Sequence, residues 1–150
     1  MLKANPTARG VLVDLPQVVA NAPKALSALG VADRVEAVGC DFFQSVPAAD
    51  VYLVKHVLHD WDDAQCVKIL QQCARSLKPG GKVVVVEMVI PDDGSPSMAP
   101  MMDLNMLVLV PGRERSRAEY SALFRSAGLS DAKITPTHSP YSLIEATKAA

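Results

Sequence analysis

The sequence predicts an α/β fold with a mostly parallel sheet, and three observations indicate this class. Short β-branched runs alternate with segments whose apolar residues recur at helical spacing, the pattern of strands joined by helices. The run 82–90 (KVVVVEMVI) is apolar on both faces, as is typical of a central strand covered by helices. The length of 150 residues, with 49% hydrophobic and 21% charged residues, suits a globular domain, so we expect one domain over 1–150 without a linker.

The first part of the chain predicts three strands and one helix. The run 10–14 (GVLVD) is a compact apolar strand that ends in an acid. Residues 15–29 have helical apolar spacing, and Gly30 closes this helix as a carboxyl-terminal cap. Two further strands are expected at 34–38 and at 51–57 (VYLVKHV).

The segment 62–77 carries the clearest helical signal. Asp62 can cap this helix, with Gln65 three residues later in a capping-box arrangement. The apolar face of the helix includes Cys66 and Cys73, so we expect both cysteines in the core as small hydrophobic side chains. The residues KPGG (78–81) predict a type II turn before the strand 82–90.

In the last part of the chain, Ser116 and Glu119 form a second capping box that opens a helix running to Ala127. The other elements expected there are a loop over 91–100, an apolar helix over 101–110 and strands over 131–135 and 142–147.

Charge and cysteine content exclude several classes of function. Fifteen Lys and Arg face sixteen Asp and Glu, for a net charge of −1 and a pI near 6.3, so we expect no nucleic-acid partner and no binding to anionic membranes. No apolar run reaches the ~20 residues of a membrane-spanning helix. The three cysteines form no CxxC, which argues against disulfides or a zinc site and favours a cytoplasmic protein with reduced thiols.

Acids follow the first two predicted strands, where ligands bind in doubly wound sheets. Asp14 can accept hydrogen bonds from both hydroxyls of a ribose, or can serve as a helix cap. Asp41 beside Phe42 can bind an adenine, or can be a turn acid beside a core aromatic ring.

A second cluster follows the predicted strand 51–57, where two histidines, an acid and the only tryptophan lie together over 55–61. Histidine is the side chain best suited to accept a proton near neutral pH, although an isolated histidine is more often structural. Glu87 lies inside an apolar strand, where a charge is costly unless it is functional or bound to backbone amides.

Methionines concentrate between 98 and 106, either as core residues or as the wall of a pocket for a flat ligand. The run 113–115 (RER) is expected to be solvated unless Glu114 points back into the site. Because no metal cluster, GxSxG turn or GK[ST] loop occurs, metal catalysis and acyl-serine chemistry are disfavoured.

The chain resembles a known family along nearly its whole length, through a series of segments in the same order. These are VLVDLPQVV (11–19), GCDFF (39–43), YLVKHVLHDWDD (52–63), KPGGKVVVVEMVIPD (78–92), MMDLNMLVLVPGRERS (101–116) and AGL (127–129). The series resembles the catalytic domain of S-adenosylmethionine-dependent small-molecule O-methyltransferases, which include plant phenolic and bacterial hydroxyneurosporene and polyketide-tailoring enzymes. LHDWDD and KPGGKVVVVE are the specific segments.

The resemblance implies a Rossmann-like class I methyltransferase fold, with S-adenosylmethionine as cofactor and a hydroxylated aromatic or polyketide-like substrate. His59 matches the general base that deprotonates the acceptor hydroxyl, and Glu87 and Glu114 match the two acids that orient it. The other roles that it implies are cofactor binding by Asp14, Asp41, Phe42, Lys55 and Trp61, and a substrate wall of Met102 and Met106. It implies no role for His56.

The resemblance also implies that parts of the family domain are absent. Residues 1–6 resemble the end of the helix after the glycine-rich loop, so the first central strand, that loop and the amino-terminal dimerisation domain have no match. In the family strand order 3-2-1-4-5-7-6, loss of strand 1 leaves a gap or a non-native pairing in mid-sheet, since unpaired buried backbone groups are costly.

Three functions therefore remain open from the sequence. The first is methyl transfer by a partial catalytic domain over 1–150. The second is a non-catalytic remnant or interaction module that pairs through its open sheet edge, which would also give a homo-oligomer. The third is a nicotinamide-dependent oxidoreductase, because Asp14 also suits ribose binding there, although hydride transfer requires no histidine–acid set.

Overall fold

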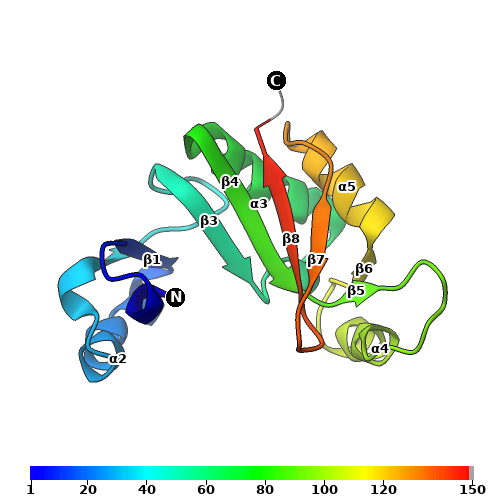
Figure 1. Ribbon diagram of the computed structural model, residues 1–150, viewed down its shortest axis with the longest axis horizontal. Coiled ribbons are helices and arrows are strands. Elements are labelled where there is room, and N and C mark those ends of the chain that lie inside the picture. Colours follow the sequence, from blue (N-terminus) through cyan, green and yellow to red (C-terminus); the bar gives the residue numbers. More distant parts are fainter. Residues whose placement is uncertain (149–150) are drawn as a thin grey trace. The chain divides into compact units, whose positions relative to one another are not determined.

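The computed structural model describes residues 1–148, and the chain divides after Pro47 into two units (Figure 1). Unit 1 is Met1–Pro47, and unit 2 begins at Ala48. Among the described residues, one sheet lies in unit 1 and two sheets lie in unit 2, and no strand joins a sheet of one unit to a sheet of the other. The sequence led us to expect one domain, and the missing ladder between the sheets explains the division.

Unit 1 is a two-stranded parallel sheet with short helices. Strand β1 (Gly10–Asp14) pairs with β2 (Val35–Gly39) in the register Gly10↔Val35 to Asp14↔Gly39. The other elements are η1 (Leu2–Ala4), α1 (Pro16–Val19), α2 (Ala22–Ala28) and η2 (Ala32–Arg34). The helix expected over 15–29 is thus split in two, because Pro23 has no N–H to donate to the preceding turn.

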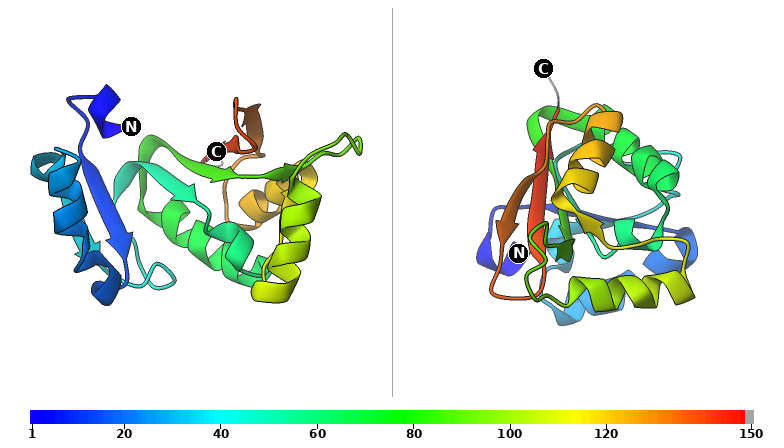
Figure 2. Two further views of the ribbon diagram at one scale, coloured as in Figure 1. Left: turned by 90° about the horizontal axis from the view of Figure 1, so that it is seen from below. Right: turned by 90° about the vertical axis from the view of Figure 1, so that its right-hand side faces the viewer.

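Unit 2 contains a four-stranded sheet in the order β3-β4-β8-β7. Its elements are β3 (Ala49–Lys55), η3 (Leu58–Asp60), α3 (Asp63–Ser76), β4 (Leu77–Glu87), β5 (Val89–Ile90), α4 (Ala99–Leu109), β6 (Arg115–Ser116), α5 (Arg117–Ser126), β7 (Lys133–Pro136) and β8 (Ser142–Thr147). Strands β3 and β4 are parallel, whereas β8 is antiparallel to both of its neighbours. Helices α3 and α5 cover one face of this sheet (Figure 2).

The strand orders test the expectation of a disturbed sheet. In the family numbering, β1 and β2 are strands 2 and 3, and the order β3-β4-β8-β7 is 4-5-7-6. Both orders agree with the resemblance, and β1 and β3 are not paired with each other. Among residues 1–148, the non-native pairing that the sequence left open therefore does not occur.

Local capping signals are confirmed at two helices of unit 2, α3 and α5. Asp62 Oδ1 accepts a hydrogen bond of 2.8 Å from the Gln65 amide at the start of α3, although the Gln65 side chain binds Lys68 and not the cap. Ser116 and Glu119 form a complete capping box at α5. The predicted core cysteines Cys66 and Cys73 are 0% and 3% exposed.

The predicted turn at 78–81 lies inside β4. Ala49 pairs with Leu77 and Val51 pairs with Lys82, so the four residues KPGG are looped out of the ladder. Gly80 has φ +75°, the left-handed conformation that a type II turn requires. The turn is therefore present, but the strand continues through it.

Candidate active site

Glu87 is the last residue of β4, and its carboxylate is completely buried at 0% exposure. Its Oε1 accepts hydrogen bonds from the backbone amides of Val57, Leu58 and His59, at 3.1, 2.7 and 3.3 Å. Its Oε2 accepts a hydrogen bond of 2.7 Å from the hydroxyl of Tyr120 on α5. Burial and the nearby Glu87 charge raise the pKa of Tyr120 well above its usual value, so this hydroxyl stays a donor.

These contacts explain how a charge is tolerated in an apolar strand. The first amides of a helical turn have no partner within the turn, and Glu87 satisfies those of η3. Among the described residues, the hydrogen bonds of Glu87 reach the backbone of His59 and not its ring. The sequence left two interpretations of Glu87 open. Its contacts are those of the structural interpretation, an acid bound to backbone amides.

The His59 ring lies against a second buried acid. Its Nδ1 is 2.9 Å from Oε1 of Glu114, which is 1% exposed, while the His59 side chain is 14% exposed. A carboxylate can only accept, so Nδ1 carries the proton and Nε2 is the unprotonated, basic nitrogen of the neutral ring. The hydrogen bond to Glu114 raises the pKa of His59, although partial burial opposes the shift. Asp60 Oδ1 lies 3.5 Å from Nε2.

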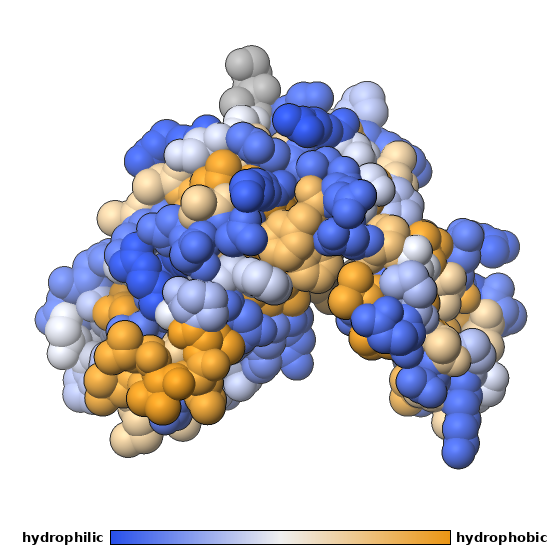
Figure 3. Space-filling view, turned by 180° about the vertical axis from the view of Figure 1, so that it is seen from behind, coloured by the Kyte–Doolittle hydropathy of each residue, from blue (hydrophilic) through white to orange (hydrophobic). Residues whose placement is uncertain are grey.

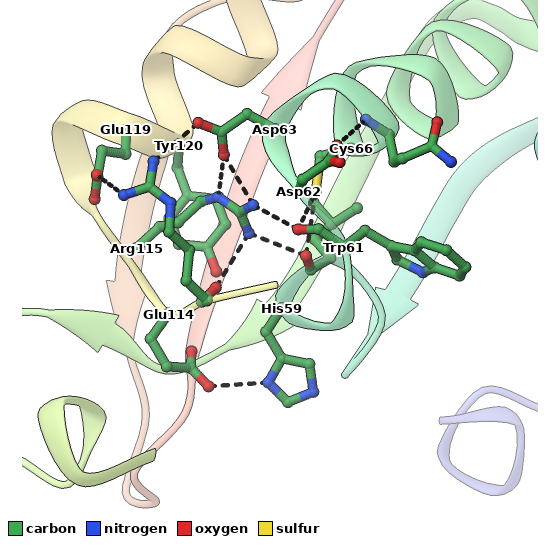
Figure 4. A network of polar contacts seen from close by, with 12 residues as sticks. His59, Trp61, Asp62, Asp63, Cys66, Glu114, Arg115, Glu119 and Tyr120 are labelled. Carbon is green, nitrogen blue, oxygen red and sulfur yellow. Dashed lines mark hydrogen bonds and ion pairs between the residues drawn. The ribbon is translucent and has the colours of Figure 1, made fainter. Parts of the chain in front are cut away.

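A buried arginine completes this group of side chains (Figure 4). The guanidinium of Arg115 is 0% exposed and donates to the carbonyls of Leu58 and Trp61, at 3.0 and 2.8 Å. Its Nε also donates to Oδ1 of Asp63 at 2.9 Å. The expected solvated run 113–115 is thus wrong for Arg115, which is buried and binds Leu58, 57 residues away along the chain. Glu114 points back into the site, as the expectation allowed.

The sequence missed Arg115 and Tyr120 as parts of this site. Tyr120 is 0% exposed, in the first turns of the helix that the Ser116 capping box opens. Because the cap fixes where α5 starts, it also fixes which face Tyr120 lies on. The position of Tyr120 on the helix, counted from the Ser116 cap, is the sequence signal that could have indicated its contact with Glu87.

The predicted adenosine-binding residues lie in unit 1, at the carboxyl end of its two strands. Asp14 ends β1, and its Oδ1 accepts from the Leu15 amide at 2.7 Å. The Cys40 amide donates to the Asp14 carbonyl at 2.9 Å, so Asp41 follows at the same edge. Asp41 accepts from the Phe43 amide at 2.9 Å in a turn, and the rings of Phe42 and Phe43 are 4.9 Å apart.

The remaining predicted residues are in unit 2 with His59. Lys55 is exposed at the end of β3, and the half-buried Trp61 follows η3 directly. On α4, Met102 is half-buried and Met106 is 8% exposed. The structure thus brings His59, Glu87 and Glu114 together, and it brings Asp14 and Asp41 to one edge of the other unit.

Two features are absent from the described part of the chain. Residues 1–148 contain no group of three His, Cys, Asp or Glu side chains that could share a metal ion. None of the helices in this part of the chain combines the length and apolar character needed to cross a lipid bilayer.

The model of the O-methyltransferase domain family matches residues 1–130. This chain belongs to the O-methyltransferase domain family. Among curated proteins, it is 42% identical over 147 residues to a phenazine O-methyltransferase of Lysobacter antibioticus, covering 97% of this chain and 43% of the relative. This family membership leaves the hypothesis of a nicotinamide-dependent oxidoreductase without support.

Solved O-methyltransferase structures share the fold. The crystal structure of LaPhzM matches with a TM-score of 0.93 and 42% identity, covering 98% of this chain and 45% of that one. NcsB1, an O-methyltransferase from neocarzinostatin biosynthesis solved with S-adenosylmethionine and 2-hydroxy-5-methyl naphthoic acid, matches with a TM-score of 0.86 and 36% identity, covering 98% of this chain and 43% of that one. The predicted Rossmann-like class I methyltransferase fold is confirmed, and the predicted cofactor is the one bound in that enzyme. The chain spans less than half the length of these relatives.

Proposed function

We propose that this chain provides the base and the adenosine-binding residues for methyl transfer from S-adenosylmethionine to a hydroxyl of an aromatic or polyketide-like small molecule. The observation that carries the proposal is the 2.9 Å contact between Nδ1 of His59 and the buried Glu114. This contact leaves Nε2 as the basic nitrogen, which is the requirement for a general base.

The proton step follows from the two ring nitrogens. Phenolic hydroxyls have a pKa of about 10, so a neutral imidazole within hydrogen-bond reach assists their deprotonation. Nε2 of His59 takes the acceptor's proton as the oxygen attacks, and Glu114 stabilises the resulting imidazolium through Nδ1. Held by Asp14, Asp41 and Phe42, S-adenosylmethionine would supply the electrophilic methyl group to the attacking oxygen and would leave as the neutral thioether.

Asp14, Asp41 and Phe42 fit the adenosine part of the cofactor. Asp14 uses Oδ1 for the Leu15 amide, and no hydrogen bond to its Oδ2 occurs within residues 1–148, which leaves an acceptor for ribose hydroxyls. Asp41 and the Phe42 ring lie at the same strand edge, and we assign them to the adenine. Lys55 and Trp61, at the ends of β3 and η3, are proposed to line the cofactor side of the site.

The acceptor is assigned by class only. Met102 and Met106 on α4 are proposed as the apolar wall against a flat ring, because methionine adapts to planar ligands. Two relatives point to fused aromatic compounds: one is named for a phenazine, and the other is solved with a hydroxylated naphthoic acid. A hydroxylated aromatic substrate is therefore the first class to assay.

The experiment measures S-adenosylhomocysteine formation with a monohydroxyphenazine and with 2-hydroxy-5-methyl naphthoic acid. Because the chain matches the carboxyl-terminal part of its relatives, it is tested alone and as a chimera that replaces that part of the Lysobacter enzyme. We expect His59→Gln to lower turnover in the active form by about 10²- to 10⁴-fold, the usual contribution of a general base.

His138→Gln is the matched control, because His138 is exposed in the segment between β7 and β8. This variant should keep full turnover. If His59→Gln is as active as the unsubstituted protein, His59 is not the base. If the chain and the chimera both fold and neither transfers a methyl group, the proposed function is wrong for this chain.

One observation favours a second function, pairing with another chain through β3. This strand is at the end of its sheet, and Val51 and Leu53 on it are 41% and 52% exposed. An unpaired apolar edge is a template for a further strand, including that of a second copy. We expect a concentration-dependent dimer in analytical ultracentrifugation that Leu53→Lys converts to monomer. A monomer at every concentration would remove this function.

A further inference from the structure

The general base lies on a very short element. The turn η3 has three residues, Leu58–Asp60, and a single 3₁₀ turn has weak hydrogen-bond geometry by itself. Its amide side is held by the carboxylate of Glu87. What holds its carbonyl side decides how well the His59 ring is placed.

Arg115 holds that carbonyl side. Its Nη1 donates to the Leu58 carbonyl at 3.0 Å and to the Arg113 carbonyl at 3.2 Å, and its Nη2 donates to the Trp61 carbonyl at 2.8 Å. Asp63 neutralises the charge through Nε. A guanidinium that is 0% exposed and bound at all three nitrogens is fixed in place.

We propose that Arg115 is a positioning residue for methyl transfer, which holds the backbone of η3 at the distance where Glu114 reaches the ring of His59. The inference rests on the proposed function of His59 as the base. No substrate or cofactor contact is assigned to Arg115.

The order of residues along the chain supports this role. Glu114 and Arg115 are consecutive, so one backbone segment binds η3 twice, through the ring of His59 and through the carbonyls that flank it. Strand β6 begins at Arg115 and pairs with β5 through Val89↔Arg115. Any movement of η3 away from Arg115 therefore also lengthens the contact between His59 and Glu114.

Gly112 provides an independent observation of the same contact. A Cβ placed on Gly112 would lie 1.9 Å from the His59 carbonyl oxygen and 2.5 Å from the Trp61 amide nitrogen. The backbone before Glu114 thus touches the backbone of η3 directly. The close approach leaves no room for η3 to shift toward this segment, while Arg115 prevents a shift away from it.

Lysine cannot replace this arginine. The guanidinium is a planar fork whose separate nitrogens reach Leu58, Trp61 and Asp63 at once. An ammonium is a single point charge on a flexible stem, so it keeps the charge but cannot bridge these groups. Arg115→Lys therefore separates positioning from charge.

The charged and titratable groups that face His59 are known from each neighbouring element. They are Asp60 on η3, Glu87 on β4, Glu114 before β6, and His56, whose ring centroid is 5.5 Å from that of His59. Of these, the hydrogen bond to Glu114 is the largest cause that raises the pKa of His59. The pKa of His59 therefore reports whether the ring still meets Glu114.

The test compares Arg115→Lys with Arg113→Met by NMR in the full chain. Arg113 binds the same Asp63 and belongs to the same charged run, but its side chain is 45% exposed and touches no η3 carbonyl. In Arg115→Lys we expect the pKa of His59 to fall and the amides of 57–59 to exchange about tenfold faster, as loss of charged hydrogen bonds implies. Arg113→Met should change neither.

Turnover in the chimera is the second measurement. Arg115→Lys should lower kcat by on the order of 10- to 100-fold, the cost of a small misplacement, with KM for S-adenosylmethionine unchanged. The acid limb of the pH–rate profile should move to lower pH with the pKa of His59. The proposal is overturned if Arg115→Lys and Arg113→Met give the same His59 pKa and the same amide exchange.

Asp63→Asn decides the question if Arg115→Lys does not fold. Asp63 is 52% exposed, so its substitution loosens the guanidinium without emptying a buried site. A lower His59 pKa in Asp63→Asn supports the proposal, and an unchanged one overturns it. Because the NMR readouts need no turnover, they remain valid if His59→Gln shows that the base assignment fails.

Discussion

The two units of this chain hold their functional acids in different ways. In unit 2, Glu87 and Glu114 are buried and bonded to groups from several elements. In unit 1, Asp14 and Asp41 are half-exposed, and their carboxylates accept only from amides or side chains within three residues. The proposed base is therefore preorganised by a core, whereas the proposed adenosine site is shaped by local turns.

The difference follows from how many hydrophobic side chains each unit can bury. Among the described residues, Val19 and Val31 are the buried hydrophobic side chains of unit 1, and the remaining ones belong to unit 2. A two-stranded sheet is marginal in water, and chains of this length rarely build an adequate core. Unit 2 has a four-stranded sheet with two covering helices, which is enough to bury charged groups with their partners.

Unit 2 also exposes one apolar surface that its core does not cover. Five side chains of α4 are at least 65% exposed, namely Met101, Leu104, Leu107, Val108 and Leu109. They form the hydrophobic area over α4 in Figure 3. The helix that carries the proposed substrate wall is thus the least buried helix of the better-packed unit.

Separating the units should give the largest effect. We expect residues 48–150 alone to unfold cooperatively in denaturant and residues 1–47 alone to show no cooperative transition, because only the former contain a core. Circular dichroism during urea titration measures both. A cooperative transition in 1–47 would show that unit 1 is stable by itself and would break the comparison.

Removal of the Glu87 carboxylate should be the most destabilising single change. Glu87→Ala leaves three amides and the Tyr120 hydroxyl without their acceptor, at a cost of about 3 kcal/mol or more. Urea unfolding monitored in unit 2 measures this change. Glu145→Ala is the control, because Glu145 binds the half-exposed Lys82 in a surface pair worth about 1 kcal/mol or less. Equal losses in the two variants would contradict the role of Glu87.

The His59–Glu114 contact should give stability a specific pH dependence. The pKa of His59 is raised in the folded state, so its contribution is complete below the unfolded pKa of about 6.5 and is lost as pH rises through the folded value. The unfolding free energy of the native chain should exceed that of His59→Gln by about 1 kcal/mol near pH 5.5, and by less at pH 9. A difference that grows with pH would contradict this sign.

Asp14→Ala should have the smallest effect on stability. Its carboxylate supports one local amide, so the loss should be about 0.5 kcal/mol or less. The same variant should weaken S-adenosylmethionine binding about tenfold in the chimera, because charged hydrogen bonds to the ribose are lost. Isothermal titration calorimetry measures the affinity, and an unchanged affinity would remove Asp14 from the cofactor site.

Elements with strong local signals could be predicted from the sequence. The Asp62 and Ser116 caps fix the starts of α3 and α5, and the apolar run 82–90 gives the central strand β4. His59, Glu87 and Glu114 could be singled out because they match family segments. The apolar spacing over 15–29 continues across Pro23 and so predicts one helix, although this proline separates α1 from α2.

Contacts between distant residues could not be predicted. The run 113–115 looks solvated because its sequence neighbours are polar, whereas the partners of Arg115 are backbone carbonyls of Leu58 and Trp61. Backbone carbonyls carry no sequence signal. His56, which follows β3, lies in the left-handed region with φ 52°, and a single histidine is too weak a signal to predict this conformation.

The pKa of the His59 ring in the native chain and in Glu114→Gln tests the central claim most directly. Two-dimensional NMR of the imidazole signals follows the rings of His59 and His138 as pH changes, and the exposed His138 serves as internal reference. We expect a native His59 pKa above its ordinary value of about 6.5, with the proton on Nδ1, and a lower pKa in Glu114→Gln. An identical His59 pKa in the two proteins would contradict it.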